Sequence, residues 1–152
     1  MIDIRQIELR DVDIVFSQVY KLASQSGGVP PDFVLTRERL INELFAEQAD
    51  WHGLVATKNN KIIGSCLYEF VNTNRPFNNT ACLFIDIFFI EPDSRQKGVG
   101  ELLMGKLINI AHNRGLSRIE FCCLKDNDVA KKFYMKIGAK KLELLDVYNL
   151  NI

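Results

Sequence analysis

Hydrophobic positions near the start of the chain repeat at the spacing of an α-helix. Val15, Val19 and Leu22 share one helical face, and Asp11 stands before them as a candidate N-cap. The Gly-Gly and Pro-Pro pairs within 24–32 then break the helical pattern. We therefore predict a first helix that begins at Asp11 and ends before this segment.

A second amphipathic helix is predicted to begin at Thr36. Threonine is a favoured N-cap residue, and Leu35 and Leu40 have the spacing of a hydrophobic staple across the helix start. The buried stripe of this helix is expected to comprise Leu40, Ile41, Leu44 and Phe45.

From residue 51 the pattern changes to that of β-strands. Runs at 53–57 and 61–70 are joined by a turn at 58–60, whose asparagines tolerate left-handed backbone. A polar, Asn-rich loop over 72–80 follows. The run 81–90 is apolar at every position except one aspartate, which predicts a strand that is covered on both faces.

The middle of the chain predicts a parallel crossover. A polar loop over 91–97 leads into a helix over 99–114, which ends at Gly115, and a strand over 118–124 follows. A strand, a helix and a strand with short connections form a right-handed β-α-β unit. The buried stripe of the helix is expected to comprise Leu103, Leu107, Ile110 and Ala111.

The last predicted elements are a helix over 128–137, closed by Gly138, and a strand over 142–150. The order of elements predicts a single domain over residues 1–152 of the α+β class. Its central sheet is expected to be mixed, antiparallel in the N-terminal part, with one parallel β-α-β crossover and flanking helices.

Composition narrows the class of protein. The 152 residues are 47% hydrophobic and 25% charged, with a formal net charge of zero, as in a one-domain globular protein. Without surplus Lys and Arg the chain is not expected to bind nucleic acid. No apolar run approaches the roughly 18 residues of a membrane span, and the N-terminus lacks a secretory signal pattern. We expect a soluble, cytoplasmic protein without a membrane partner.

The cysteines and histidines indicate neither a metal site nor a catalytic thiol. No C-x-x-C spacing occurs, the histidines lie in unrelated segments, and the cysteines fall in apolar, strand-like runs where buried cysteine is common. These residues are Cys66, Cys82, Cys122, Cys123, His52 and His112.

The segment 95–100, Arg-Gln-Lys-Gly-Val-Gly, lies between a buried strand and a helix. Gly98 and Gly100 permit positive φ and expose the backbone, and the helix start supplies unpaired N–H groups with partial positive charge. Arg95 and Lys97 add cationic side chains. This arrangement predicts a site for a phosphate or pyrophosphate, and the alternative is a glycine-rich surface turn.

Two other phosphate-binding loops compare less well with this segment. A Walker A loop is excluded because G-x-x-x-x-G-K-[ST] is absent. A Rossmann loop stays open as an alternative, since Glu120 lies about 20 residues downstream, where a ribose-binding acid is expected. Leu103, however, occupies the third small position of that motif.

The pattern R/Q-x-x-G-x-G/A after a hydrophobic strand resembles motif A of the GCN5-related N-acetyltransferases, which bind the pyrophosphate of acetyl-coenzyme A. A second stretch, Asn127-x-x-Ala130-x-x-Phe133-Tyr134 with Gly138 after it, resembles motif B of that family. The resemblance covers nearly the whole chain. It is strongest for the diamine/spermidine acetyltransferase branch, which is similar at 33–36, 85–90 and 133–134.

The resemblance implies direct attack of a primary amine on acetyl-coenzyme A, without a covalent enzyme intermediate. Asp86 is the candidate base, because a lone carboxylate in an apolar strand is costly and burial raises its pKa. The resemblance implies that Tyr134 is the acid that protonates the departing thiolate. The alternatives are a structural aspartate and a core tyrosine.

The family also implies the residues that contact the cosubstrate. The backbone of 88–90 is expected to pair with the pantetheine arm, and Asn127 either caps a helix or lies near the cosubstrate. The full set expected to bind acetyl-coenzyme A is Phe88, Phe89, Ile90, Arg95, Gln96, Lys97, Gly98, Val99, Gly100, Glu101, Asn127 and Lys132.

The acceptor is expected to be a small primary amine, such as a polyamine, a diamine or an amino-acid-like amine. Glu69 and Asp86 are the candidate acceptor-binding residues, and 25–33 is expected to form one wall of the cleft. The alternatives are a protein-lysine or N-terminal acetyltransferase, and a non-catalytic coenzyme A sensor. The family also implies a homodimer. Further acids available for a cationic acceptor, or for a merely solvated face, are Glu38, Glu43, Glu47 and Asp50.

Overall fold

The computed structural model describes residues 1–25, 33–73, 75–78, 80–143 and 145–152. These residues form two compact units, Met1–Cys122 and Cys123–Ile152, and each unit is described by itself. That the two units make a single domain stays a prediction. The segment expected to form one wall of the acceptor cleft lies, from residue 26 to residue 32, outside the described residues.

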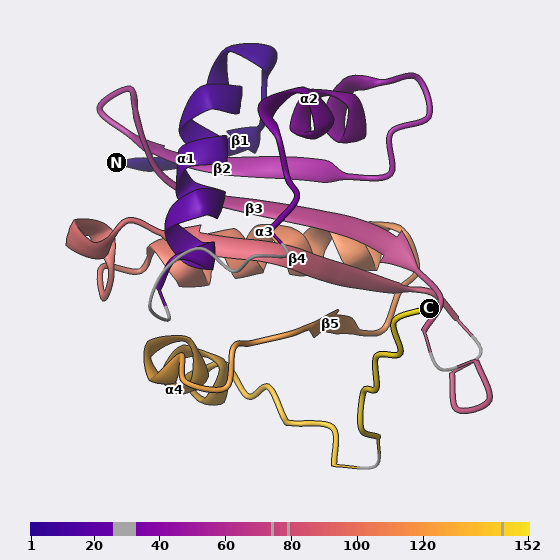
Figure 1. Ribbon diagram of the computed structural model, residues 1–152. Coiled ribbons are helices and arrows are strands. Elements are labelled where there is room, and N and C mark those ends of the chain that lie inside the picture. The colour runs from indigo at the N-terminus through magenta and orange to yellow at the C-terminus, as the bar shows by residue number, and fades with distance from the viewer. Residues whose placement is uncertain (26–32, 74, 79, 144) are drawn as a thin grey trace. The chain divides into compact units, whose positions relative to one another are not determined.

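The first unit is built on a five-stranded sheet with the strand order β1-β2-β3-β4-β5 (Figure 1). Neighbours from β1 to β4 are antiparallel, whereas β4 and β5 are parallel and joined through a helix. The predicted α+β class, with a mixed sheet and one parallel crossover, is therefore confirmed. The strands are β1 (Ile2–Gln6), β2 (His52–Lys58), β3 (Lys61–Val71), β4 (Cys82–Ile90) and β5 (Ile119–Phe121).

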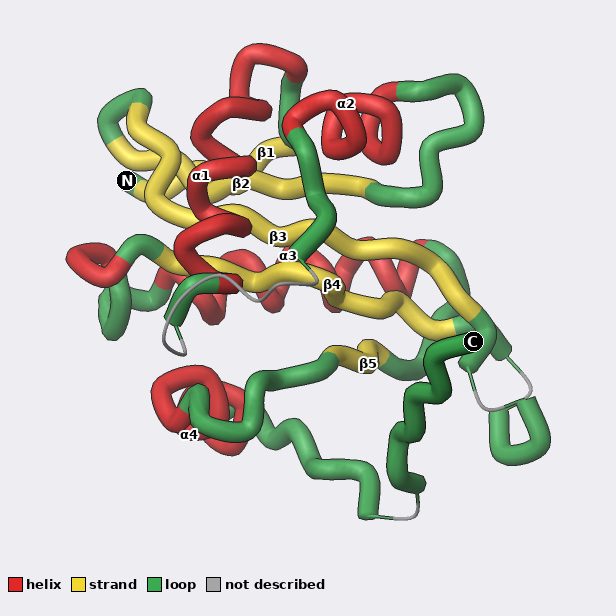
Figure 2. Tube along the Cα trace, viewed as in Figure 1, coloured by secondary structure: helices red, strands yellow, loops and turns green. Residues whose placement is uncertain are grey.

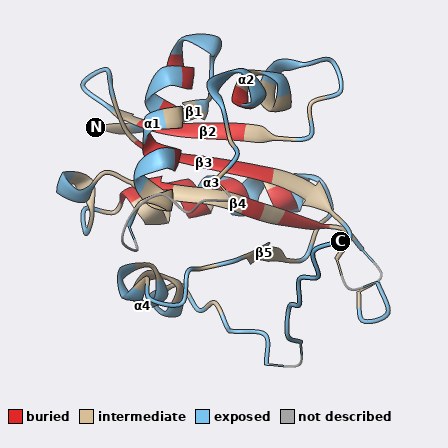
Figure 3. Ribbon diagram, in the orientation of Figure 1, coloured by how far each residue is buried: buried red, intermediate tan, exposed pale blue. Residues whose placement is uncertain are grey.

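Helices cover both faces of this sheet. Helices α1 (Val12–Ala23) and α2 (Arg37–Phe45) lie on one face, and α3 (Val99–Asn113) lies on the other, as Figures 1 and 2 show. Strands β2 to β4 are the most buried (Figure 3), and the core under α1 and α2 is a continuous apolar cluster. Its fully buried members are Val12, Val15, Val19, Leu40, Val55 and Leu67.

The predicted helix cap and the predicted hairpin turn are both present in the structure. The hydroxyl of Thr36 accepts a hydrogen bond from the backbone N–H of Arg39 at 3.1 Å, so Thr36 caps α2. Asn59 and Asn60 have φ values of 50° and 62° in the turn between β2 and β3. Phe45 is a correction: it is 39% exposed, whereas Ile41 and Leu44 of the same helix pack against the core cluster.

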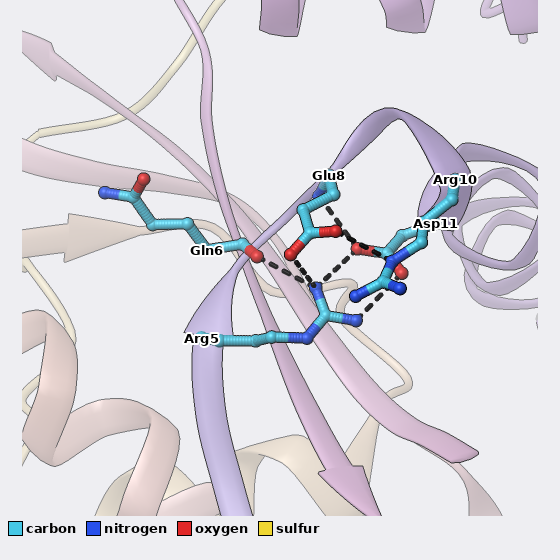
Figure 4. A network of polar contacts seen from close by, with 5 residues as sticks. All are labelled: Arg5, Gln6, Glu8, Arg10 and Asp11. Carbon is cyan, nitrogen blue, oxygen red and sulfur yellow. Dashed lines mark hydrogen bonds and ion pairs between the residues drawn. The ribbon is translucent and has the colours of Figure 1, made fainter. Parts of the chain in front are cut away.

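Asp11 stands at the N-terminus of α1 but does not cap that helix, contrary to prediction. Its buried carboxylate instead accepts two hydrogen bonds from the guanidinium of Arg5, at 2.6 and 2.9 Å, and one from the backbone N–H of Glu8, at 2.8 Å (Figure 4). A short 3₁₀ turn, Leu9–Asp11, precedes α1. In this turn the Asp11 carboxylate bonds to Arg5 and to the Glu8 N–H instead of to the first turn of α1. The Arg5–Asp11 pair therefore fastens β1 to the start of α1.

Removing the guanidinium of Arg5 is expected to destabilise the fold. In Arg5→Met the buried Asp11 carboxylate loses its partner, which costs about 3 kcal/mol in the free energy of unfolding. The matched control is Arg10→Met, because Arg10 is 72% exposed and pairs with a half-exposed Glu8. Urea unfolding is expected to shift the control by less than about 0.5 kcal/mol. Equal effects of the two substitutions would contradict the role of the pair.

The same contact predicts a pH dependence of stability. The hydrogen bonds from Arg5, opposed by burial, hold the pKa of Asp11 below its ordinary value of 3.8. The native state therefore binds this proton less tightly than the unfolded state, and the stabilisation is complete above that ordinary value. It is lost as the pH falls through the native pKa, and Arg5→Met is expected to remove this loss from an acid-unfolding curve.

The described residues of the second unit form one helix, α4 (Asp128–Lys136). The predicted strand over 142–150 is wrong: residues 142–143 and 145–150 are outside any strand, and no described residue pairs with them. Their side chains are exposed, and a strand is stable only where a neighbour takes its backbone hydrogen bonds. In the described ranges of both units, no helix is long and apolar enough to cross a bilayer.

Two further expectations from the pattern are corrected. The strand β1 is absent from the predicted elements, although Ile2-Asp3-Ile4-Arg5 alternates between apolar and polar side chains. Cys66 and Cys82 are buried as expected, but Cys122 is exposed and Cys123 only half-buried, because β5 ends at Phe121.

Candidate active site

Strands β4 and β5 pair over only part of the length of β4. The parallel ladder joins Leu83, Phe84 and Ile85 to Ile119, Glu120 and Phe121. Beyond Ile85, β4 continues from Asp86 to Ile90, past the end of the ladder. The two strands thus provide a place where an extended ligand could lie along β4 without competing with β5.

A β-bulge lies where this ladder ends. On the β3 side, Leu67 pairs with Ile87 and Tyr68 pairs with Ile85, so Asp86 is the extra residue in β4. A bulge bends its strand and redirects the side chain of the extra residue, and bulges are common beside active sites. In the sequence, this site is indicated by one feature, the lone charge of Asp86 in an otherwise apolar strand.

The Asp86 carboxyl is half-buried, and its Oδ2 atom is buried without a hydrogen-bond partner among the described residues. Burial, with the nearby charge of Glu69, raises the pKa of Asp86 to about 6, although a hydrogen bond from Trp51 opposes the shift. A carboxylate with this pKa is largely ionised at pH 7 and accepts a proton more readily than an ordinary aspartate. The chemistry fits a general base.

One acidic side chain, Glu69, acts directly on the Asp86 carboxyl, and two further acids act on Glu69. Glu69 lies on β3, and burial together with the charges of Asp50 and Glu43 raises its pKa. Asp50 precedes β2, and Glu43 lies on α2, paired with Arg39 at 3.4 Å. Glu69, Asp50, Glu43 and Asp86 are named the acidic cluster. In the described part of the chain no group of three or more His, Cys, Asp or Glu side chains could hold a metal ion.

The predicted phosphate loop has the backbone geometry of an open cradle. Gly98 has a φ of 81° and begins α3 without a side-chain cap, and a Cβ added there would meet nothing within 4 Å. The helix's first backbone hydrogen bond runs from Leu102 to Gly98, which leaves the N–H groups of Val99 and Gly100 at the open end. The residues present therefore fit a pyrophosphate group.

Some details of this loop differ from expectation. Gly100 lies within the helix, and the second positive φ, 58°, belongs to Gln96. Arg95 turns back to the strand, where its Nε donates to the carbonyl of Ile90 at 2.9 Å and its guanidinium lies 5.8 Å from the centre of the Phe89 ring. Arg95 therefore braces the loop against the end of β4.

The other residues of the first unit that are predicted to contact acetyl-coenzyme A differ in how exposed their side chains are. Val99 and Phe89 are almost fully buried, so only their backbone groups are accessible to a ligand. Lys97 is exposed, and its ammonium donates to the carbonyl of Asp93 at 2.6 Å. Half-buried positions are Phe88, Ile90 and Glu101, and Gln96 is exposed.

The second unit carries the other predicted site residues. The side chain of Asn127 accepts a hydrogen bond from the backbone N–H of Ala130 at 3.1 Å, so Asn127 caps α4. Tyr134 is half-buried on α4, with its ring centre 5.7 Å from that of Phe133. Lys132 is exposed on the same helix.

The Rossmann alternative is not supported. Glu120 lies in β5, and its carboxylate accepts hydrogen bonds from the side chains of Thr73 at 2.6 Å and Arg118 at 3.1 Å. A ribose-binding acid would need this carboxylate accessible, and a Rossmann sheet is mostly parallel. The sheet here has one parallel pair.

Comparisons with known proteins agree with the geometry. Residues 17–139 match the model of the Acetyltransferase (GNAT) family. Thialysine N-epsilon-acetyltransferases from Mus musculus and Sus scrofa are 25% and 24% identical over 116 residues, which is 71% of this chain and 66% of each relative. The chain thus spans just under two-thirds of the length of these relatives.

Solved structures show the same fold at low identity. A ribosomal-protein-alanine N-acetyltransferase from Brucella melitensis is 18% identical, with a TM-score of 0.75 and full coverage of both chains. The aminoglycoside N-acetyltransferase AAC(6')-Iy in complex with CoA is 16% identical, with a TM-score of 0.79, over 100% of this chain and 96% of that one. With the family match over most of its length, the chain belongs to the GNAT family of acetyltransferases.

Proposed function

We propose that this protein transfers the acetyl group of acetyl-coenzyme A to a primary amine of a small, cationic molecule. The proposal rests on one observation above all: Asp86, whose buried Oδ2 atom has no hydrogen-bond partner among the described residues, lies at a bulge where the β4–β5 ladder ends. The family match supplies the reaction class. The similarity to thialysine N-epsilon-acetyltransferases supports a small amine as acceptor.

The acidic cluster supports a cationic acceptor. A primary amine of pKa about 10.4 is an ammonium ion at pH 7, and it costs roughly 4–5 kcal/mol to deprotonate without help. Glu69, Asp50 and Glu43 would attract this cation, and Asp86 would take up the proton that the amine must lose. Polyamines and diamines carry a second cation that the other carboxylates of the cluster would bind.

We assign the other predicted residues to the cosubstrate and to the leaving group. The open backbone at Gly98, Val99 and Gly100 would hold the pyrophosphate, and the 88–90 backbone would pair with the pantetheine arm. Tyr134 would return a proton to the coenzyme A sulfur. Arg95, Gln96, Lys97, Glu101, Asn127 and Lys132 complete the proposed contacts. The homodimer and the cytoplasmic location stay predictions.

A thiol-release assay tests the function directly. Purified protein and acetyl-coenzyme A would be mixed with spermidine, putrescine, lysine, thialysine or a histone peptide, and free coenzyme A measured. Turnover with the small amines, at rates well above the peptide, is expected. Turnover with the peptide alone would favour a protein acetyltransferase, and coenzyme A binding without turnover on any amine would favour a sensor.

The substitution Asp86→Asn separates a catalytic from a structural aspartate. We expect kcat/KM for the amine to fall about 100-fold at pH 7, and the loss to shrink toward pH 10, where more of the amine is already neutral. In the wild type, kcat/KM is expected to rise as the pH passes about 6, the pKa of Asp86.

Thermal unfolding gives the second readout. Because the pKa of Asp86 is raised, the folded state binds this proton more tightly than the unfolded state, and stability falls as the pH rises from the ordinary value of 3.8 to about 6. Asp86→Asn is therefore expected to raise the Tm at pH 7. A lower Tm with unchanged turnover would identify Asp86 as a structural residue.

A further inference from the structure

Glu91 stands where β4 ends and the connection to α3 begins. Its backbone N–H donates to the carbonyl of Ile63, in β3, at 2.9 Å, and its own carbonyl accepts from the N–H of Ser94 at 2.8 Å. The second of these bonds closes a short 3₁₀ turn, Pro92–Ser94. Glu91 is therefore the residue at which the chain leaves the sheet, just ahead of the predicted phosphate loop at 95–100.

The side chain of Glu91 joins this point to α1. One carboxylate oxygen, Oε1, accepts hydrogen bonds from the amide of Gln18 at 3.0 Å and from the ammonium of Lys21 at 3.1 Å. The other oxygen, Oε2, accepts a further bond from Lys21 at 3.1 Å. Gln18 and Lys21 lie three positions apart on α1, so they share one face of that helix. Glu91, Gln18 and Lys21 are named the carboxylate clamp.

Gln18 is a costly residue for its position. Its side chain is fully buried, and the amide oxygen Oε1 is buried without a hydrogen-bond partner among the described residues. A buried polar atom without a hydrogen bond destabilises a fold, and an apolar side chain of similar size would avoid that cost. The amide donates its one hydrogen bond to Glu91. A local rule of stability is thus broken for this contact, which favours a role for it beyond stability.

Two other side chains hold the connection between β4 and α3, and both do so over a short distance in sequence. Arg95 donates to the carbonyl of Ile90, and Lys97 donates to the carbonyl of Asp93. These bonds brace the loop against its own neighbours. The carboxylate clamp, in contrast, fastens the start of the loop to a helix that lies 70 residues or more earlier in the chain.

We propose that Glu91 is a positioning residue for cosubstrate binding: the carboxylate clamp fixes the start of the loop, so that the N–H groups of Val99 and Gly100 face the pyrophosphate before it binds. This inference rests on the proposed function, which places the pyrophosphate of acetyl-coenzyme A at this loop. A loop that is ordered beforehand loses less conformational freedom on binding, and the affinity is higher for that reason. Lys21 offsets the charge of Glu91, which alone would repel an anion.

Removal of the carboxylate separates positioning from simple electrostatics. Glu91→Met keeps the length of the side chain but removes a negative charge near the proposed anion site, so the change in charge alone would tighten coenzyme A binding. Lost positioning has the opposite sign. We expect the Kd for coenzyme A, measured by isothermal titration calorimetry, to rise about tenfold. A Kd that is unchanged or lower in the folded variant would overturn the proposal.

Lys21→Met weakens the clamp without removing the partner of the buried amide. The Lys21 side chain is 52% exposed, and Glu91 can still accept from Gln18 in this variant. We expect the Kd for coenzyme A to rise about threefold. The matched control is Lys61→Met, which makes the same change at an exposed position of β3 and is expected to keep the wild-type affinity. If Glu91→Met does not fold, equal Kd values in the two lysine variants would overturn the proposal.

A shortened donor tests whether the effect depends on the pyrophosphate. S-acetylpantetheine carries the same thioester as acetyl-coenzyme A but lacks the pyrophosphate. In Glu91→Met we expect KM for acetyl-coenzyme A to rise about tenfold with kcat unchanged, and kcat/KM for S-acetylpantetheine to keep its wild-type value. A general weakening of the fold would lower the rates with both donors. Equal losses with the two donors would therefore contradict the positioning role.

Hydrogen exchange tests the clamp without any ligand. In the free protein, we expect the backbone amides of 94–100 to exchange about tenfold faster in Glu91→Met than in the wild type, while those of 103–113 within α3 keep their rates. Equal loop rates would overturn the inference even if coenzyme A binds as proposed. If the loop amides respond but the wild type binds no coenzyme A, the contact stands, and the proposed function fails together with the positioning role built on it.

Discussion

Gly98→Glu is expected to abolish coenzyme A binding while the protein remains folded. The introduced side chain would enter the open space in front of Gly98, where the pyrophosphate is proposed to lie. A carboxylate among groups that bind an anion repels that anion and fills its place, so the Kd for coenzyme A should rise at least about 100-fold. Isothermal titration calorimetry with coenzyme A measures this change directly.

The same helix provides the control. Gly115 follows α3 at its other end, has a φ of 70°, and also has nothing within 4 Å of an added Cβ. Gly115→Glu therefore introduces the same side chain and a similar backbone strain of roughly 1–2 kcal/mol, far from the loop. We expect similar Tm values for the two variants and wild-type affinity in Gly115→Glu. Normal affinity in Gly98→Glu would disprove the assignment of residues 95–100.

The elements that could be predicted from the sequence are those with local causes. Thr36 and Asn127 accept hydrogen bonds from backbone groups three residues away, and Asn59 and Asn60 adopt left-handed backbone within a two-residue turn. Such preferences depend on neighbours in the chain and need no tertiary contact. For the same reason the bounds of α3 and α4 agree with prediction within one residue.

Features that depend on distant partners could not be predicted. Asp11 has the sequence position of a cap, but the guanidinium of Arg5 offers its carboxylate a stronger interaction. Residues 142–150 have apolar side chains typical of a strand, yet no described residue supplies a ladder. In both cases the structure depends on whether another segment supplies a hydrogen-bond partner. The local sequence pattern does not specify the position of that segment.

The candidate site could also be predicted only in part: single residues were evident from the sequence, but their arrangement was not. Asp86 is conspicuous as a lone charge in an apolar run, and its burial follows from that setting. The bulge at Asp86 depends on the register between β3 and β4, which no local pattern specifies. The acids of the cluster come from α2, β3, β4 and the connection before β2, which is why single residues could be named but not their grouping.

Tyr134→Phe is expected to lower kcat by about 10²–10⁴-fold with the Kd for coenzyme A nearly unchanged. The phenol supplies a proton to a thiolate that otherwise leaves poorly, and phenylalanine keeps the ring that packs beside Phe133 while removing that proton. Single-turnover measurements with a saturating amine isolate this step from product release.

A second tyrosine of the same unit provides the comparison. Tyr148 is 90% exposed, so Tyr148→Phe makes the same chemical change where no role is proposed. It is expected to leave the single-turnover rate and the Tm at wild-type values. If Tyr134→Phe also left the rate unchanged, the proton for the sulfur would have to come from solvent or another group, and Tyr134 would be a packing residue of α4. A loss confined to Tyr134→Phe, with intact coenzyme A binding, supports the phenol as the general acid, because only its proton has been removed.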